Sequence, residues 1–363
     1  MQKNSRRIQV VVLMGLLSLL VWSVSVAQDT ITLADAAIQP ESIEYNPATD
    51  TFLVSSIATG TIYEVAADGT VTPFIQDEAL VSSAGIMIDA ARNRLLVVTS
   101  GLGQILGQLG QGGFPGGQFP EGFPTPDPSQ FPGGVPQPGQ LPPGFDPSQL
   151  PEGFALPDFT IRLLAFDLTS KEQLFNVDLT NVAPAGRKFA NDITVDADGN
   201  VYVTDSLAGA VYRVDATGSP TFLSHVAFTG EGLGVNGIEF RDGSLIVGKT
   251  SDGTLYKVPL DNPQNVTQVQ VPEALTGADG ITFTADGKLL VVSGQGTLYV
   301  LSSTDSWATA AIDQKITTPS GAAAATLRDQ DIYVLVGGLQ IPMNAVDAAA
   351  TPPTPQIVKV TAA

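Results

Sequence analysis

The stretch FANDITVDADGNVYVTDSLAGAVYRV, residues 189–214, carries the pattern on which the fold depends. Short runs of alternating apolar residues, rich in Val, Tyr and Thr, are separated by the turn sequences DADGN and SLAG. Such alternation is typical of β-strands, and Gly, Asn and Asp between the runs are typical of tight turns. The stretch therefore predicts three consecutive antiparallel strands, followed by a weaker fourth strand.

The same unit recurs along the chain. Three further copies are clear and two are degenerate: SIEYNPATDTFLVSSIATGTIYEV (42–65), GIEFRDGSLIVGKTSDGTLYKV (237–258), GITFTADGKLLVVSGQGTLYVL (280–301), GIMIDAARNRLLVVTS (85–100) and GAAAATLRDQDIYVLVGG (321–338). The residues that precede the six units are separated by 43, 107, 45, 43 and 41 positions. Four strands in about 40 to 45 residues is the period of a propeller blade. The sequence therefore predicts an all-β fold, a six-bladed β-propeller with four-stranded blades and a central channel.

Three segments stand outside this repeat. Residues 102–157 are rich in Gly and Pro and interrupt blade two between its second and third strands, and residues 338–355 occupy the same place in blade six. Both are expected as loops on the face where the inner strands begin, either as a lid or as decoration of a loop tip. The segment TITLAD, residues 30–35, is expected to supply the outer strand of the last blade and so to close the ring.

The amino-terminal residues 1–27 are interpreted as a signal peptide. Three basic residues precede an apolar run from Ile8 to about Val26, and the small residues of Ser-Val-Ala, 25–27, suit cleavage. A single transmembrane anchor is the alternative, but the apolar run is short and interrupted by serine. Residues 28–363 are then one propeller domain of a secreted protein, extracellular or periplasmic, without stable membrane insertion after cleavage.

Composition limits the partners. The chain has 17 Lys and Arg against 36 Asp and Glu, a net charge of −19, and no cysteine. So acidic a surface repels nucleic acid and anionic membranes, and it suits solubility or the binding of cations. Without cysteine the protein has no disulfides, and its stability must come from the core. A small-molecule substrate is the expected partner, and a monomer is favoured although the oligomeric state is unknown from sequence.

The residue before each unit is expected at the rim of the channel. Around the ring these residues are Glu41, Ala84, Asn191, Asn236, Asp279 and Ser320. Two carboxylates and two amides are oxygen ligands that suit a hard divalent cation, Ca²⁺ or another such as Mg²⁺ or Mn²⁺. The absence of His and Cys from the set argues against zinc and copper. The alternative is that these Asn and Asp residues only cap turns between blades.

Four motifs resemble a known superfamily. They are PES (40–42), FANDITVDADGNVYVTDS (189–206), VNGIEF (235–240) and GADGITFTADGKLLVV (277–292). They are similar to the senescence marker protein, gluconolactonase and luciferin-regenerating enzyme superfamily, which includes diisopropylfluorophosphatase. The resemblance implies a six-bladed propeller with a divalent ion at the channel mouth, held by Glu41, Asn191, Asn236 and Asp279. It also implies that Asp279 is the nucleophile or general base in hydrolysis of a lactone or phosphoester.

The chain departs from the superfamily in two places. Sugar lactonases usually carry Arg two residues before the blade-three Asn, where this chain has Phe189. His225 is the only histidine, so the histidine dyad of the related paraoxonases is impossible, and a packing role is expected for it. The leading hypothesis is a calcium-dependent hydrolase of a small lactone, ester or phosphoester. A non-catalytic, metal-stabilised binding or scaffold propeller is the main alternative, and a metal-free propeller of the strictosidine-synthase kind is a third.

Overall fold

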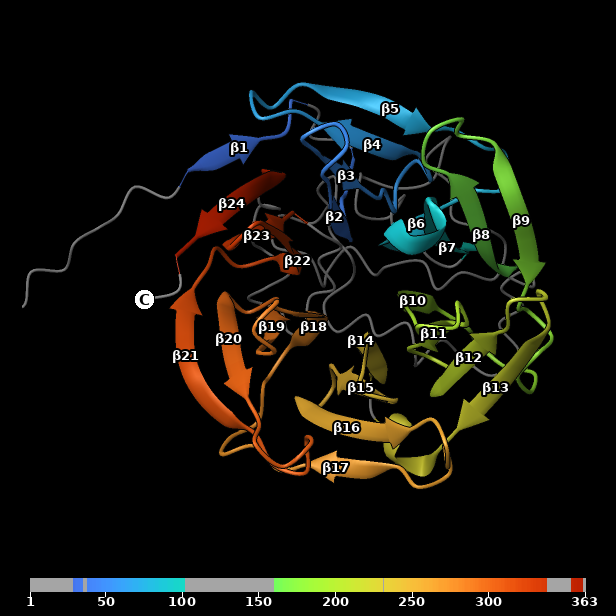
Figure 1. Cartoon of the computed structure of the whole chain (residues 1–363), viewed down its shortest axis with the longest axis vertical. Coiled ribbons are helices and arrows are strands. Elements are labelled where there is room, and N and C mark those ends of the chain that lie inside the picture. Colours follow the sequence, from blue (N-terminus) through green and yellow to red (C-terminus); the bar gives the residue numbers. More distant parts are fainter. Residues whose placement is uncertain (1–28, 35–37, 102–159, 231, 338–353, 362–363) are drawn as a thin grey trace, which may run out of the picture.

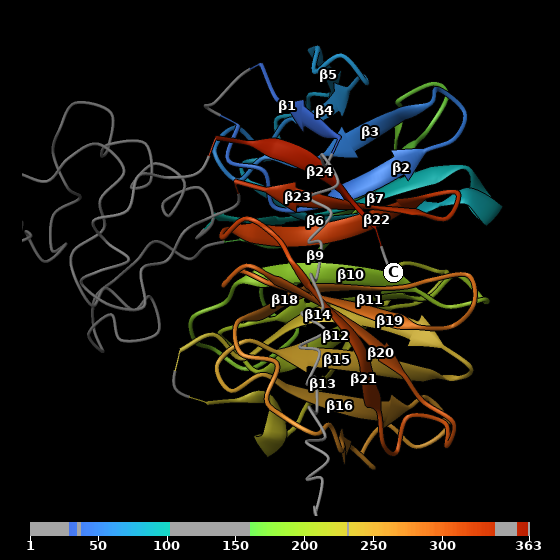
Figure 2. The ribbon, with the colours of Figure 1, turned by 90° about the vertical axis from the view of Figure 1, so that its left-hand side faces the viewer.

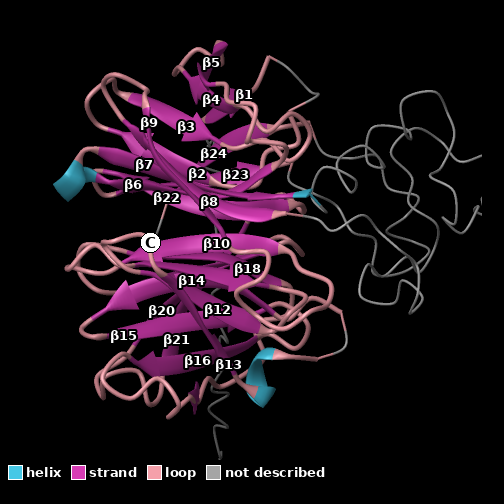
Figure 3. Cartoon of the chain, turned by 90° about the vertical axis from the view of Figure 1, so that its right-hand side faces the viewer, coloured by secondary structure: helices cyan, strands magenta, loops and turns pink. Residues whose placement is uncertain are grey.

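The computed structural model describes residues 29–34, 38–101, 160–230, 232–337 and 354–361. Six four-stranded antiparallel sheets form a ring, and each sheet is one blade (Figure 1). Strands make up almost all of the regular structure (Figure 3). This confirms the prediction of an all-β, six-bladed propeller. No helix in the described ranges is long and apolar enough to cross a membrane.

The strands of each blade run in order from the centre outward. Blade one holds β2 (Ile43–Asn46), β3 (Thr51–Val54), β4 (Ile62–Val65) and β5 (Val71–Ile75), and blade two holds β6 (Ser83–Asp89), β7 (Arg94–Ser100), β8 (Ile161–Asp167) and β9 (Gln173–Asp178). Blade three holds β10 (Ala190–Val195), β11 (Val201–Asp205), β12 (Ala210–Val214) and β13 (Pro220–Ser224), and blade four holds β14 (Val235–Arg241), β15 (Ser244–Lys249), β16 (Thr254–Pro259) and β17 (Thr267–Val269). Blade five holds β18 (Ala278–Phe283), β19 (Leu289–Ser293), β20 (Thr297–Ser302) and β21 (Ala311–Thr317). Blade six holds β22 (Ala322–Arg328), β23 (Asp331–Val336) and β24 (Gln356–Val360), with β1 (Thr30–Thr32) outermost. Short 3-10 turns, η1 (Ala90–Arg92) and η4 (Val226–Phe228), follow β6 and β13.

The strand β1 closes the ring. It pairs antiparallel with β24, in the register Thr30↔Val358, Ile31↔Ile357 and Thr32↔Gln356, and the two strands lie side by side in Figures 1 and 2. Residues from the two ends of the described chain thus share one sheet, as expected for the segment TITLAD. Closure of this kind covers the edge that an open array of blades would leave exposed.

The apolar core lies between neighbouring blades. One cluster packs Leu163 of blade two against Tyr212 of blade three, and another packs Leu290 of blade five against Val334 of blade six. Second strands such as β19 are buried along their whole length, whereas the outermost β21 alternates between exposed and half-buried residues. Each blade therefore depends on both neighbours for its buried surface.

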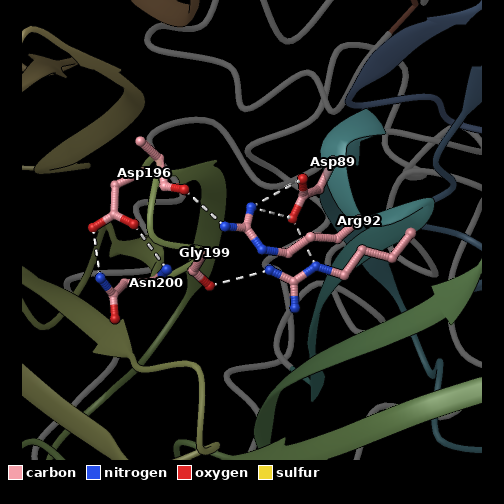
Figure 4. A network of polar contacts seen from close by, with 7 residues as sticks. Asp89, Arg92, Asp196, Gly199 and Asn200 are labelled. Atoms are coloured by element: carbon pink, nitrogen blue, oxygen red, sulfur yellow. Dashed lines mark hydrogen bonds and ion pairs between the residues drawn. The ribbon is translucent and has the colours of Figure 1, made fainter.

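On the face opposite the start of the inner strands, a charged network joins blades two and three (Figure 4). The buried carboxylate of Asp89 accepts hydrogen bonds from Arg92 Nη1 at 3.2 Å and from Arg94 Nε at 2.8 Å. Arg92 Nη2 also donates to the carbonyl oxygen of Ala197 at 2.8 Å, and Arg94 Nη2 donates to that of Gly199 at 3.1 Å. A planar guanidinium can bind a carboxylate and a carbonyl together, so the network holds the first turns of the two blades in a fixed relation.

The predicted loops 102–157 and 338–355 lie almost entirely outside the described residues. The strands that flank the first loop pair directly: Ser100 is opposite Ile161, and the N–H of Gly101 donates to the carbonyl oxygen of Thr160 at 3.2 Å. The two ends of the loop are therefore already as close as the ends of a hairpin turn.

Deletion of residues 102–157 is expected to leave a folded propeller with unchanged β content and a melting temperature within a few degrees of wild type. A short turn can connect β7 to β8, and shortening a loop costs little because closure entropy changes slowly with length. Circular dichroism and a thermal melt measure both quantities. Deletion of residues 28–34, which removes β1, is the contrasting variant and should lower the melting temperature clearly. An unfolded 102–157 deletion would contradict the assignment of β7 and β8 to one blade.

Candidate functional site

The four predicted ligands meet at the channel mouth. Glu41 lies just before β2, and Asn191, Asn236 and Asp279 are the second residues of β10, β14 and β18. All four line one cavity of about 10 Å³, and both asparagines are 3% exposed. A cavity of this size holds about one water molecule or one ion. The structure thus brings the predicted set together around a space for a single small species.

The sixth rim position differs from the prediction. Ala323, together with Ala324, lines the cavity, whereas Ser320 is exposed and precedes β22. The pairing of β22 with β23 shifts register between Ala322 and Ala324, which places Ala323 where the other blades have their rim residue. A run of four alanines contains no alternation of apolar and polar residues. The sequence therefore suggests that Gly321 corresponds to the glycines in the other units, which the structure does not bear out. Blades two and six, on either side of blade one, therefore contribute alanine to the rim.

A local irregularity in the inner strands turns the rim residues toward the channel. The pairing of β10 with β11 shifts register between Ala190 and Ile193, and the same shift occurs in blades two, four and five. Such a bulge places two residues opposite one and redirects a side chain. The residue after the blade-four ligand must be small: a Cβ on Gly237 would lie 2.3 Å from the carbonyl oxygen of Asp279. Neighbouring inner strands therefore approach each other closely at the rim.

Hydrogen bonds orient the two amides. Asn191 Nδ2 donates to Ser206 Oγ at 3.0 Å. Asn236 Nδ2 donates to Asp279 Oδ1 at 2.7 Å and to Thr250 Oγ1 at 3.2 Å. Each amide nitrogen donates to protein acceptors. The amide oxygen, on the other side of the planar group, is therefore the atom that can coordinate a cation.

At the mouth, the negative charge of one carboxylate makes ionisation of the other less favourable. Burial raises the pKa of Asp279 well above its usual value, and the negative charges of Glu41 and Asp192 raise it further. The hydrogen bond from Asn236 opposes this rise only in part. A cation between Glu41 and Asp279 would reverse the balance, because opposite charge favours the ionised form. The site is therefore electrostatically suited to a positive ion.

Three further carboxylates line the channel below the mouth, and sequence reasoning did not single them out. Asp192, Glu44 and Glu239 face a cavity of about 30 Å³, and none of the described residues that line it is lysine or arginine. Burial raises the pKa of Asp192 to about 7, and burial together with the charge of Asp192 raises the pKa of Glu239 to about 7. The pKa of Glu44 is raised well above its usual value for the same reasons. Across the described residues, no three His, Cys, Asp or Glu side chains are arranged to hold a metal.

Glu239 makes the metal-free protein sensitive to pH. The folded state keeps the proton of Glu239 up to about pH 7, whereas the unfolded state releases it near 4.5. The bound proton therefore contributes its full stabilisation of the folded state below about pH 4.5, and this contribution is lost as pH rises toward 7. In a chelator, Glu239→Gln should reduce the fall in melting temperature between pH 5 and pH 8 by a few degrees, as measured by thermal melts. An equal fall in both proteins would contradict a protonated Glu239.

The residues that mark departures from the superfamily have structural roles. Phe189 is buried, and its N–H donates to Asp205 Oδ1 at 2.8 Å. His225 follows β13, where its Nδ1 accepts from the N–H of Ala227 at 3.1 Å and its ring packs on Phe228. These contacts agree with a packing role for His225.

A larger cavity, of about 420 Å³, lies beside blade three and includes Arg187 but none of the four predicted ligands.

Comparison with known proteins yields structural likeness only. Neither a scan against protein-family models nor a search of curated proteins finds a match. Among solved structures, the luciferin-regenerating enzyme is 12% identical, with a TM-score of 0.55 over 91% of this chain and 95% of that one. A gluconolactonase from Xanthomonas campestris is 17% identical, with a TM-score of 0.51 over 91% and 89%. Virginiamycin B lyase from Staphylococcus aureus is 13% identical, with a TM-score of 0.51 over 91% and 97%.

These likenesses establish the fold. All three proteins are six-bladed propellers, and the first two belong to the superfamily that the sequence motifs resemble. The third is named as a lyase, so proteins with this fold are not confined to hydrolysis. The reaction of the present protein must therefore be argued from its own site.

Proposed function

We propose that this protein is an exported, calcium-dependent hydrolase of a small lactone, ester or phosphoester. The observation that supports it is the meeting of Glu41, Asn191, Asn236 and Asp279 around one ion-sized cavity at the channel mouth. The donor set fits calcium, because it offers two carboxylates and two amide oxygens and no nitrogen or sulfur ligand. The low-identity likeness to a gluconolactonase and to luciferin-regenerating enzyme agrees with this class of activity.

In this proposal Asp279 acts on the substrate. When bound, a calcium ion would supply a Lewis acid that polarises the C=O or P=O bond. Asn236 holds Oδ1 of Asp279 at 2.7 Å, which leaves Oδ2 as the oxygen that attacks or that accepts a proton from water. Among the described residues, blades two and six contribute only the small side chain of alanine to the rim beside Glu41, and in this proposal substrate approaches from that side.

The test combines binding with turnover. Calcium should raise the melting temperature, since it binds the folded state, and a chelator should lower it. A panel of lactones, aryl esters and phosphotriesters should then include a substrate whose hydrolysis stops in chelator and returns with Ca²⁺, Mg²⁺ or Mn²⁺. Absence of any metal-dependent shift in the melting temperature would refute the proposal.

The second candidate function is a binding or scaffold propeller in which the ion only stabilises the ring. It is favoured by the size of the mouth cavity, which among the described residues is about 10 Å³ and matches a single ion. Calcium binding without turnover of any compound in the panel would support this function over the hydrolase.

A further inference from the structure

In blades two to five, each rim residue has an equivalent neighbour at the end of the second strand of its blade or directly after it. The last pairs before the bulges are Ser83↔Thr99, Ala190↔Asp205, Val235↔Lys249 and Ala278↔Ser293. The rim residue follows the first member of each pair, and we call the residue that follows the second member its seat: Ser100 for Ala84, Ser206 for Asn191, Thr250 for Asn236 and Gly294 for Asp279. Because the strands are antiparallel, the seat lies level with the residue before the pair and not directly opposite the rim residue. In all four seats the backbone N–H donates to the carbonyl oxygen two residues before the rim residue, at 2.9–3.1 Å. The seats are thus equivalent in backbone geometry and differ in side chain.

A hydroxyl in the seat bonds to the rim residue where that residue is asparagine. The two blades with a rim amide have a hydroxyl in the seat, and this hydroxyl accepts from the amide nitrogen. The blade with Asp279, which has no N–H to be held, has Gly294. In blade two the seat of Ala84 is Ser100, and Ser100 Oγ is buried without a hydrogen-bond partner in the described part of the chain. A hydroxyl in this seat therefore finds its partner when the rim residue is asparagine.

Each engaged hydroxyl also reaches the next blade. Ser206 Oγ donates to the carbonyl oxygen of Val235 at 2.7 Å, directly before Asn236. Thr250 Oγ1 donates to the carbonyl oxygen of Ala278 at 2.8 Å, directly before Asp279. Because a hydroxyl has one proton, donation to the carbonyl leaves only its lone pairs for the amide. The amide must then present its nitrogen to the hydroxyl and its oxygen to the mouth.

We propose that Ser206 and Thr250 are positioning residues that fix the amide oxygens of Asn191 and Asn236 toward an ion at the channel mouth and set the spacing of the three ligand-bearing strands. This inference rests on the proposed metal-binding function. Ser206 has the larger effect, because the amide of Asn236 has a second acceptor in Asp279, whereas Asn191 depends on the hydroxyl.

The experiment is a double-mutant cycle read by calcium affinity. Ser206→Ala should weaken calcium binding by about 10-fold or more, the usual effect of removing a partner that orients a metal ligand. Ser206→Thr should restore the affinity. In an Asn191→Ala background, Ser206→Ala should have a clearly smaller effect, because no amide remains to be oriented and only the bond to the carbonyl oxygen of Val235 is lost. A loss of the same factor in both backgrounds, or no loss in either, would overturn the proposal.

Ser293→Ala is the matched control. Ser293 is a buried hydroxyl at the same end of its blade, and it donates to the carbonyl oxygen of Thr276 at 2.7 Å and not to a predicted ligand. Its replacement should leave calcium affinity within about two-fold, as expected for a site outside the ligand shell. Equal losses in the two Ser→Ala variants would mean that the effect of Ser206 is general destabilisation and would overturn the proposal.

A metal-free readout separates this inference from the proposed function. In chelator, the side-chain amide protons of Asn191 should exchange slowly with solvent by NMR, and Ser206→Ala should accelerate their exchange by about 10-fold or more, since the protecting hydrogen bond is lost. If the wild type binds no calcium, the proposed function fails, and this exchange rate alone decides whether Ser206 positions the amide. Unchanged exchange would overturn the positioning role.

Discussion

Asp279→Asn is expected to give a folded protein whose hydrolysis falls by about 10³-fold or more at saturating calcium, since an amide can neither attack nor accept the proton. The substitution keeps the length of the side chain and one oxygen. That oxygen can still accept the hydrogen bond from Asn236, which measures 2.7 Å in the wild type, and contact the ion, but the negative charge of the side chain is lost. Calcium binding should therefore weaken without disappearing, while turnover is almost lost.

The measurement compares kcat for a substrate from the panel in both proteins at full calcium occupancy, with occupancy established by titration. Asp261→Asn is the matched control, because Asp261 is exposed in the loop between β16 and β17 and the charge change is the same. Its kcat should equal that of wild type. If Asp279→Asn also retains the wild-type kcat, Asp279 is a ligand only and the hydrolase mechanism is wrong.

The fold could be predicted from sequence because the information is local and repeated. Each unit contains its own turns and alternating strands, and the spacing between units gives the number of blades. The strand β1 was also predictable, since the three strands of blade six lacked an outer partner. The rim residues followed from their place at the start of each unit. Four of the six expected residues line the mouth cavity, Ala84 holds the equivalent register position in blade two, and Ala323 replaces Ser320 in blade six.

The remaining features depend on register between strands, which the sequence of one strand does not contain. Regular alternation places residues i and i+2 on one side, but the bulge in β14 adds a residue, so Glu239 lies three positions after Asn236 and still faces the channel. The contact of Asn191 with Ser206, the residue directly after β11, likewise requires knowing the register in which β10 and β11 pair. Both features became visible only when the paired strands were seen together.

Glu41→Gln is expected to change calcium affinity and metal-free stability in opposite directions. The substitution removes one of the two negative charges in the predicted ligand set, so calcium affinity should fall by about 10-fold or more, because charge count is a main determinant of calcium affinity. In chelator the same change removes a charge that raises the pKa of Asp279, and with it a repulsion that opposes folding at neutral pH. The metal-free variant should therefore melt at a temperature equal to or above that of wild type.

Calcium affinity and metal-free stability are expected to change in opposite directions, and this makes the test specific. A variant that is simply damaged would lose both calcium affinity and metal-free stability. Calorimetric titration with calcium gives the affinity, and thermal melts in chelator near pH 8 give the stability. Glu172→Gln, at an exposed residue between β8 and β9, makes the same charge change away from the mouth and should alter neither quantity. Unchanged calcium affinity in Glu41→Gln would exclude Glu41 from the ligand set. A lower metal-free melting temperature would show instead that its carboxylate stabilises the ring through contacts that do not require an ion.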